Sequence, residues 1–184
     1  MQPDALATSR VAVSNEIVLR SPCAEDGRAV HDLIAQCPPL DRNSLYCNLL
    51  QCCHFADTCV LAQHANERGE LAGFVSAYLP PDRNDTVFVW QVAVAPTARG
   101  IGLAHRMLIE LLTRPRCAGV NLLETTITPD NQASWALFES LARSLAASWS
   151  SVPLFERDRH FGGRHETEML VTIGPFAARM PHRN

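Results

Sequence analysis

Residues 86–95 constrain the fold more than any other part of this 184-residue chain. The segment reads TVFVWQVAVA, which is almost continuously apolar and rich in β-branched and aromatic side chains. Such a run, ended here by Pro96, is typical of a strand that is covered on both faces of a sheet. Helices must provide that cover, so the segment favours an architecture in which strands and helices alternate.

The rest of the chain alternates between strand and helix patterns in the same way. Short apolar runs predict further strands at residues 16–20, 58–63, 71–79, 120–127, 152–155 and 167–173. Apolar residues at helical spacing predict helices that begin near residues 22, 44, 103 and 130. We therefore expect an α/β (α+β) fold with a mixed central β-sheet flanked by helices.

The length is that of one domain. We place it at residues 16–176, between flexible tails at residues 1–15 and 177–184. Within the domain, residues 66–69 predict a hairpin-like turn between two strands, and the polar stretch 156–166 separates the last two strands.

Composition excludes several kinds of chemistry. All 16 basic residues are Arg, so a Walker-type phosphate loop, a lysine Schiff base and a lysine general base are ruled out. The net charge of -3 argues against a nucleic-acid partner. No apolar stretch approaches the roughly 20 residues that span a bilayer, and the first residues do not resemble an export signal. We expect a cytoplasmic protein without a membrane partner.

The chain has seven Cys, an odd count, and no pattern of an export signal, and most of the Cys lie within apolar patterns. Reduced, buried thiols are the expected state. The cluster of Cys47, Cys52, Cys53 and His54 lacks the paired CxxC spacing of a zinc site. We therefore expect no metal.

A glycine-containing turn, Arg99-Gly100-Ile101-Gly102, connects the strand at 86–95 to the helix that follows. At such a junction, unpaired backbone amides and the helix dipole favour an anion such as a phosphate. Only two glycines are present, and the acidic residue expected after the next strand of a dinucleotide fold is not convincingly placed. The turn thus predicts a phosphate site, but not a Rossmann site.

The pattern around the turn resembles motif A of the GCN5-related N-acetyltransferases. Arg99, Gly102 and Ala104 fit its (Q/R)xxGx(G/A) signature within the same strand, turn and helix. Four later residues are similar to the family's motif B: Asn131, Ser134, Leu137 and Phe138. The resemblance extends over residues 16–173 and implies the family's fold.

The resemblance also implies acetyl-CoA as acetyl donor. The residues implied to bind it are Val92, Ala93, Val94, Arg99, Gly100, Ile101, Gly102, Leu103, Ala104 and Asn131. The backbone N–H near Val92 would stabilise the oxyanion, a catalytic role, while Asn131 could equally cap a helix. Phe138 stands where the family often has a Tyr that protonates the leaving thiolate, so either another group or water must supply that proton.

A narrower resemblance, through residues 39–50, 54–58 and 88–94, is to the diaminobutyrate acetyltransferases of ectoine biosynthesis. It implies acetylation of the 4-amino group of L-2,4-diaminobutyrate, a step toward a solute accumulated under osmotic stress. Two alternatives stay open: a family member acting on another small amine, and an acyl-CoA-binding regulator without turnover. The second is suggested only by Phe138.

A substrate with two amines needs carboxylates in its pocket. The candidates for substrate binding are Asp41, Tyr46, Trp90, Gln91 and Glu168, and the candidate general base is Glu166. Four of these have a structural alternative: Asp41 could cap a helix, the two Glu could be edge-strand charges, and Trp90 could belong to the core. We assign no role to His160 and His165. The late residues 152–173 are the expected contact of a homodimer.

Overall fold

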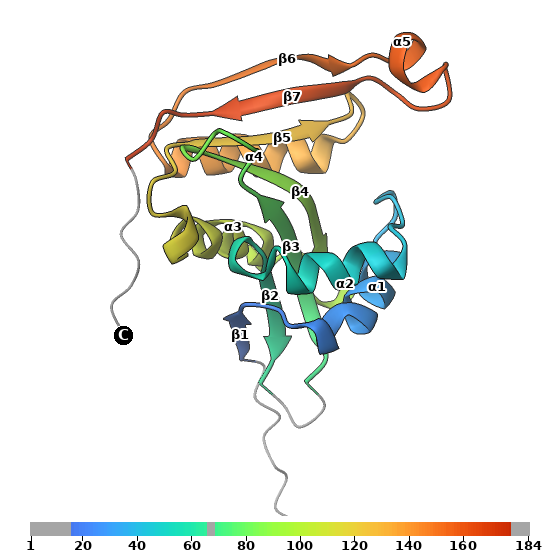
Figure 1. The fold of residues 1–184 in the computed structure, drawn as a ribbon, viewed down its shortest axis with the longest axis vertical. Coiled ribbons are helices and arrows are strands. Elements are labelled where there is room, and N and C mark those ends of the chain that lie inside the picture. Colours follow the sequence, from blue (N-terminus) through green and yellow to red (C-terminus); the bar gives the residue numbers. More distant parts are fainter. Residues whose placement is uncertain (1–15, 66–68, 178–184) are drawn as a thin grey trace, which may run out of the picture.

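The computed structural model describes residues 16–65 and 69–177, which form a seven-stranded mixed sheet flanked by helices (Figure 1). The strands are β1 (Ile17–Arg20), β2 (Val60–His64), β3 (Leu71–Tyr78), β4 (Thr86–Val94), β5 (Leu122–Ile127), β6 (Trp149–Phe155) and β7 (Glu168–Ile173). The helices are α1 (Gly27–Ala35), α2 (Leu45–Cys53), α3 (Leu103–Leu112), α4 (Gln132–Ser144) and α5 (Arg157–Phe161). The predicted fold class is confirmed. The predictions for residues 1–15, 66–68 and 178–184 lie outside the described residues.

The sheet has the order β1-β2-β3-β4-β5-β7-β6. Only the pair β4 and β5 is parallel, and every other neighbouring pair is antiparallel. Helix α1 packs against β3 and β4, and α3 packs against β2, β3 and β4. Gly73 in β3 allows α3 to approach closely, since a Cβ there would lie 2.8 Å from Cε of Met107. No helix of the described part is long and apolar enough to cross a membrane.

The C-terminal part differs from the prediction. The polar stretch at 156–166 contains the short helix α5, and β6 begins at Trp149, three residues earlier than expected. Strand β6 lies at the edge of the sheet and pairs only with β7, so it does not need the alternating pattern of a half-buried strand. Its Pro153 is also tolerated at an edge, where no further ladder needs its N–H.

The sheet divides between β4 and β5. These strands pair from Thr86↔Leu122 only as far as Val89↔Thr125. Beyond that point the rest of β4 pairs with β3 alone, while the end of β5 continues to pair with β7. The hydroxyl of Thr125 donates to the backbone oxygen of Val89 at 3.0 Å, at the last paired position. The strands therefore separate in the middle of the sheet and leave one edge of β4 open.

A β-bulge lies at the same point. In the β3–β4 ladder Ser76 pairs with Gln91 and Ala77 pairs with Val89, which leaves Trp90 as an extra residue of β4. A bulge redirects the side chains of the strand that carries it. Trp90 is accordingly 44% exposed, although its strand is central to the sheet.

Candidate active site

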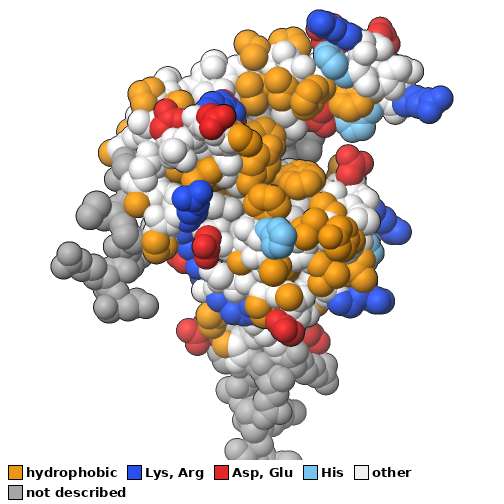
Figure 2. Space-filling view, viewed as in Figure 1, with side chains coloured by type: hydrophobic (Ala, Val, Ile, Leu, Met, Phe, Trp, Pro, Cys, Tyr) orange, Lys and Arg blue, Asp and Glu red, His pale blue; other side chains and the backbone are white. Residues whose placement is uncertain are grey.

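A cleft of about 850 Å³ opens where β4 and β5 separate. Its lining comes from five parts of the chain: residues 39–43, the second half of β4, residues 125–128, the start of α4, and residues 157–168. In the space-filling view it shows as a notch between the β6–β7 hairpin and the layer of α1 and α2 (Figure 2). Residues far apart in the sequence thus contribute to one site.

The open edge of β4 presents backbone groups to this cleft. The N–H of Ala95 donates to the oxygen of Ala72 in the β3 segment at 2.9 Å. Because alternate residues of a strand direct their backbone groups to the same neighbour, Ala93 also faces β3, and Val92 and Val94 face the other way. The oxygen of Val94 does accept from groups outside β3, Sγ of Cys37 and Nε of Arg99. The N–H of Val92 therefore points from the cleft wall with no strand beside it.

The predicted phosphate turn follows the end of β4. Gly100 and Gly102 have φ angles of +79° and +74°, the left-handed region that favours glycine. Gly102 precedes the first residue of α3 and provides no capping side chain, so the first amides of that helix are available to an external acceptor. A Cβ at either glycine would meet no atom within 4 Å, so the surface above the turn is open. The turn and Val94 lie outside the cleft lining itself.

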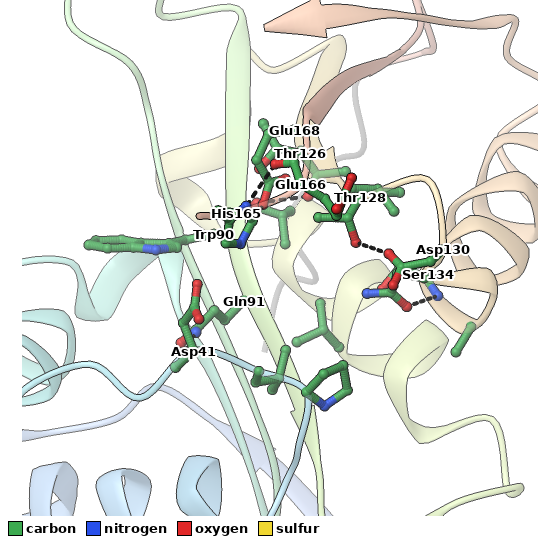
Figure 3. Close-up of a pocket in the computed structure, with 18 of the residues that line it drawn as sticks. Asp41, Trp90, Gln91, Thr126, Thr128, Asp130, Ser134, His165, Glu166 and Glu168 are labelled. Atoms are coloured by element: carbon green, nitrogen blue, oxygen red, sulfur yellow. Dashed lines mark hydrogen bonds and ion pairs between the residues drawn. The ribbon is translucent and has the colours of Figure 1, made fainter. Parts of the chain in front are cut away.

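One wall of the cleft carries Asp41 and Trp90 (Figure 3). Asp41 does not cap α2, because the hydroxyl of Ser44 accepts from the N–H of Cys47 and performs that function. Trp90 is half exposed and lies edge-on to Tyr78, with ring centroids 6.4 Å apart, so the alternative that it belongs to the core is wrong. Both residues line the cleft, and their contact with the acceptor stays a prediction.

Glu166 and Glu168 line the opposite wall (Figure 3). Glu166 forms an ion pair with Arg157 at 3.3 Å, and its side chain is 54% exposed. Glu168 begins β7, is only 19% exposed, and lies 3.8 Å from Nε2 of His165. His165, to which the sequence assigned no role, also lines the cleft. The sequence signal that could have indicated His165 as a cleft residue is its position three residues before the candidate Glu168.

Three other predicted residues have distinct positions. Asn131 accepts from the N–H of Ser134 at 3.1 Å and lines the cleft, so the cap interpretation is confirmed and its cofactor contact stays a prediction. Phe138 is 4% exposed and lines the cleft from α4. Tyr46 is 69% exposed on α2 and does not line the cleft, so its contact with the acceptor stays a prediction. The hydroxyls of Thr126 and Thr128, which the sequence did not indicate, are also in the lining.

All seven cysteines are free thiols. The prediction that they are buried holds for Cys37, Cys52, Cys59 and Cys117, whereas Cys23 and Cys53 are exposed. Burial raises the pKa of the Cys52 and Cys59 thiols to about 12. Within residues 16–65 and 69–177, no group of three or more His, Cys, Asp or Glu is arranged to hold a metal ion.

The model of the acetyltransferase (GNAT) family matches residues 28–142, more than half of the chain. This protein is a member of the acetyltransferase (GNAT) family. The family resemblance seen in the turn at Arg99 to Ala104 is thereby confirmed. In this GNAT protein, the open edge of β4 begins where its pairing with β5 ends.

Relatives within the GNAT family share most of the chain. L-2,4-diaminobutyric acid acetyltransferase from Methylotuvimicrobium alcaliphilum is 57% identical over 88% of this chain and 92% of its own. The protein of that name from Vibrio cholerae is 50% identical over 85% and 88%. Among solved structures, diaminobutyrate acetyltransferase EctA from Paenibacillus lautus, in complex with L-2,4-diaminobutyric acid and coenzyme A, superposes with a TM-score of 0.84. It is 39% identical and the match covers 91% of this chain and 99% of that one.

Proposed function

We propose that this GNAT protein transfers the acetyl group of acetyl-CoA to the 4-amino group of L-2,4-diaminobutyrate. The observation that carries the proposal is the cleft itself, in which an unpaired strand amide at Val92 and the carboxylates of Asp41 and Glu168 line one space. The first suits a carbonyl oxygen that gains charge, and the others suit ammonium groups. The similarity to diaminobutyrate acetyltransferases at up to 57% identity supports the same acceptor.

Acetyl-CoA supplies an activated acetyl thioester. The backbone of Val92 and Val94 would hold its pantetheine arm along the open edge of β4, whereas the backbone of Ala93 faces β3 and is not available for that contact. The amides of residues 99–104 would hold its pyrophosphate at the start of α3. The open space above Gly100 and Gly102 fits this role, because a phosphate must approach the backbone closely there. Asn131, which lines the cleft, would contact the arm with the part of its amide that does not cap α4.

Catalysis on this proposal needs few groups. Glu166 removes a proton from the acceptor ammonium, directly or through a water, so that the amine can attack the thioester without a covalent enzyme intermediate. The N–H of Val92 donates to the carbonyl oxygen as charge develops on it. Phe138 has no proton to give, so the departing thiolate takes a proton from water. This is tolerable because a thiol with a pKa of about 8.5 is a fair leaving group.

The acceptor would be held mainly by acidic and aromatic groups. Asp41 and Glu168 attract its ammonium groups, Trp90 and Gln91 form the wall beside the thioester, and Tyr46 contributes from α2. The two carboxylates in the cleft lining favour a small acceptor that carries two ammonium groups.

The proposed cellular setting is a cytoplasmic enzyme of ectoine biosynthesis that responds to osmotic stress. We also propose a homodimer formed through residues 152–173. Hydrophobic side chains gather along β6 (Figure 2), where Val152, Leu154 and Phe155 are all more than a third exposed at the sheet edge. An exposed apolar edge strand is usually covered by a partner.

Thiol release from acetyl-CoA tests the proposal. The purified protein is assayed with L-2,4-diaminobutyrate, ornithine, lysine, putrescine and 2,3-diaminopropionate, and NMR identifies the acetylated nitrogen. We expect selective acetylation of diaminobutyrate at its 4-amino group. Asp41→Asn should raise the KM for that substrate about tenfold, the value of one charged hydrogen bond, whereas Asp32→Asn, an exposed carboxylate on α1, should not.

Two outcomes would reject the proposal. Faster turnover of another amine would show that the protein acetylates a different acceptor by the same chemistry. Binding of acetyl-CoA without thiol release in the presence of any amine would favour the acyl-CoA-binding regulator. Calorimetry with acetyl-CoA, run on the same preparation, separates these results from a failure to fold.

A further inference from the structure

Gln91 uses both ends of its side-chain amide within the protein. Its Nε2 donates to the backbone oxygen of Asp41 at 2.9 Å, and its Oε1 accepts from Nδ2 of Asn43 at 2.7 Å. Only 8% of the residue is exposed. A buried amide with two such bonds fixes the segment that it holds, because releasing the segment would leave polar groups without partners.

The segment held in this way is the connection between α1 and α2. It is attached to β4 a second time, since Sγ of Cys37 donates to the backbone oxygen of Val94 at 3.3 Å. The two attachments lie on either side of the stretch that leads to Asp41. The carboxylate of Asp41 lines the cleft and makes no hydrogen bond or ion pair with the described residues, so it is available to a ligand.

We infer, on the basis of the proposed function, that Gln91 is a positioning residue for the acceptor amine. It holds the backbone of Asp41 so that this carboxylate stays at the cleft, beside the open edge of β4. Gln91 does not need to touch the amine, because Asp41 and Asn43 already occupy its amide. Its loss should weaken the binding of the acceptor and leave the binding of acetyl-CoA unchanged.

The test variant is Gln91→Leu, which removes both hydrogen bonds at nearly constant size. The chain offers a matched control in Gln63→Leu. Gln63 in β2 accepts from Nε of Arg20 and donates to the oxygen of Gly69, both at 2.9 Å, but does not line the cleft. A general effect of losing a bridging amide would appear in both variants, and a positioning effect only in the first.

Kinetics separate a positioning role from a direct one. KM for diaminobutyrate, KM for acetyl-CoA and kcat are measured for the wild type, Gln91→Leu, Asp41→Asn and the double variant. Gln91→Leu should raise the acceptor KM about tenfold, as expected for two buried hydrogen bonds, with the acetyl-CoA KM changed by less than about twofold. In the Asp41→Asn background the same substitution should add less than about twofold, because the carboxylate that it positions is gone.

Equal factors in the two backgrounds, or a raised KM for acetyl-CoA, would overturn the inference. Asn43→Ala provides a milder variant that keeps the bond from Gln91 to Asp41, and it should give a smaller rise in the acceptor KM than Gln91→Leu. If Gln91→Leu does not fold, the cycle is run with Asn43→Ala, and an increase that persists in the Asp41→Asn background counts against the positioning role.

Hydrogen exchange gives a readout that needs no acceptor. Peptides covering residues 37–47 should exchange faster in Gln91→Leu than in the wild type or in Gln63→Leu. Faster exchange together with no turnover of diaminobutyrate by the wild type would reject the proposed function alone. Normal exchange together with normal kinetics of Gln91→Leu would reject the positioning role alone.

Discussion

Substitution of Gly102 by Ala should weaken acetyl-CoA binding at the proposed phosphate site more than it destabilises the fold. Gly102 has a φ of +74°, and a Cβ built there meets no atom within 4 Å. The cost to folding is therefore conformational and not steric. An L-residue in the left-handed region costs roughly 1–2 kcal/mol, and the smaller entropy of the unfolded Ala chain offsets part of it. A net loss of about 1 kcal/mol should lower the Tm by about 2–4 °C for a chain of this length.

Binding should suffer more than folding. The new methyl group would point into the open space above the turn, where the pyrophosphate must approach the amides. Loss of one charge-assisted hydrogen bond is worth about 1.5–3 kcal/mol, so the Kd for acetyl-CoA should rise roughly ten- to hundredfold. Isothermal titration calorimetry with acetyl-CoA measures this directly, and thermal unfolding of the same samples measures the cost to the fold.

Gly162→Ala is the matched control. Gly162 follows α5 with a φ of +57°, and a Cβ there also meets no atom within 4 Å. It should lose a similar amount of stability and keep the affinity of the wild type for acetyl-CoA. An affinity of Gly102→Ala within about twofold of the wild type would refute the assignment. Equal weakening by both substitutions would instead indicate a general effect of placing Ala at a positive φ.

Two further predictions concern the fold around the site. Iodoacetamide should label the exposed Cys23 in the native protein but not the buried Cys117, because burial raises the pKa of the Cys117 thiol to about 11. The two cysteines lie on separate tryptic peptides, so mass spectrometry distinguishes them. Comparable labelling of both before unfolding would contradict the burial of Cys117. Asp26→Asn should cost about 2 kcal/mol at pH 7, because Asp26 accepts two 2.7 Å bonds from Arg20, which hold the pKa of that carboxyl below its usual range. A carboxyl with a lowered pKa in the folded state stabilises the fold at pH values above the ordinary pKa of Asp, and this stabilisation is lost as the pH falls through the lowered pKa. In urea unfolding, the difference in free energy of unfolding between wild type and Asp26→Asn should therefore shrink below about pH 4. A difference that stays constant down to pH 3 would contradict this.

The sequence by itself determined the local parts of the protein. The apolar run that became β4 and the turn with Gly100 and Gly102 are both explained by neighbouring residues, since strand propensity, a stop at Pro96 and a positive φ are short-range properties. The family signature lies in the same short stretch, which is why it could be recognised without the fold. The helix cap at Asn131 was likewise a local prediction.

Tertiary structure decided which residues line the cleft that we propose as the acceptor site. Asp41 and Gln91 are 50 positions apart, and nothing in the local pattern of either indicates the bond between them. The extra residue at Trp90 depends on the register of β4 against β3, and register follows from pairing over the whole sheet and not from the period of one strand. His165 was missed for the same reason, because its place in the cleft lining depends on how β7 packs beside β5.

The open edge of β4 is the clearest case of this division. The sequence specified a central strand, but it could not specify that pairing with β5 would end at Val89. That end point depends on where β5 turns toward β7, a hydrogen-bonding choice made between segments more than 40 residues apart. The local sequence thus determined the strand, and long-range pairing decided that the end of β4 beyond Val89 has no β5 residues beside it.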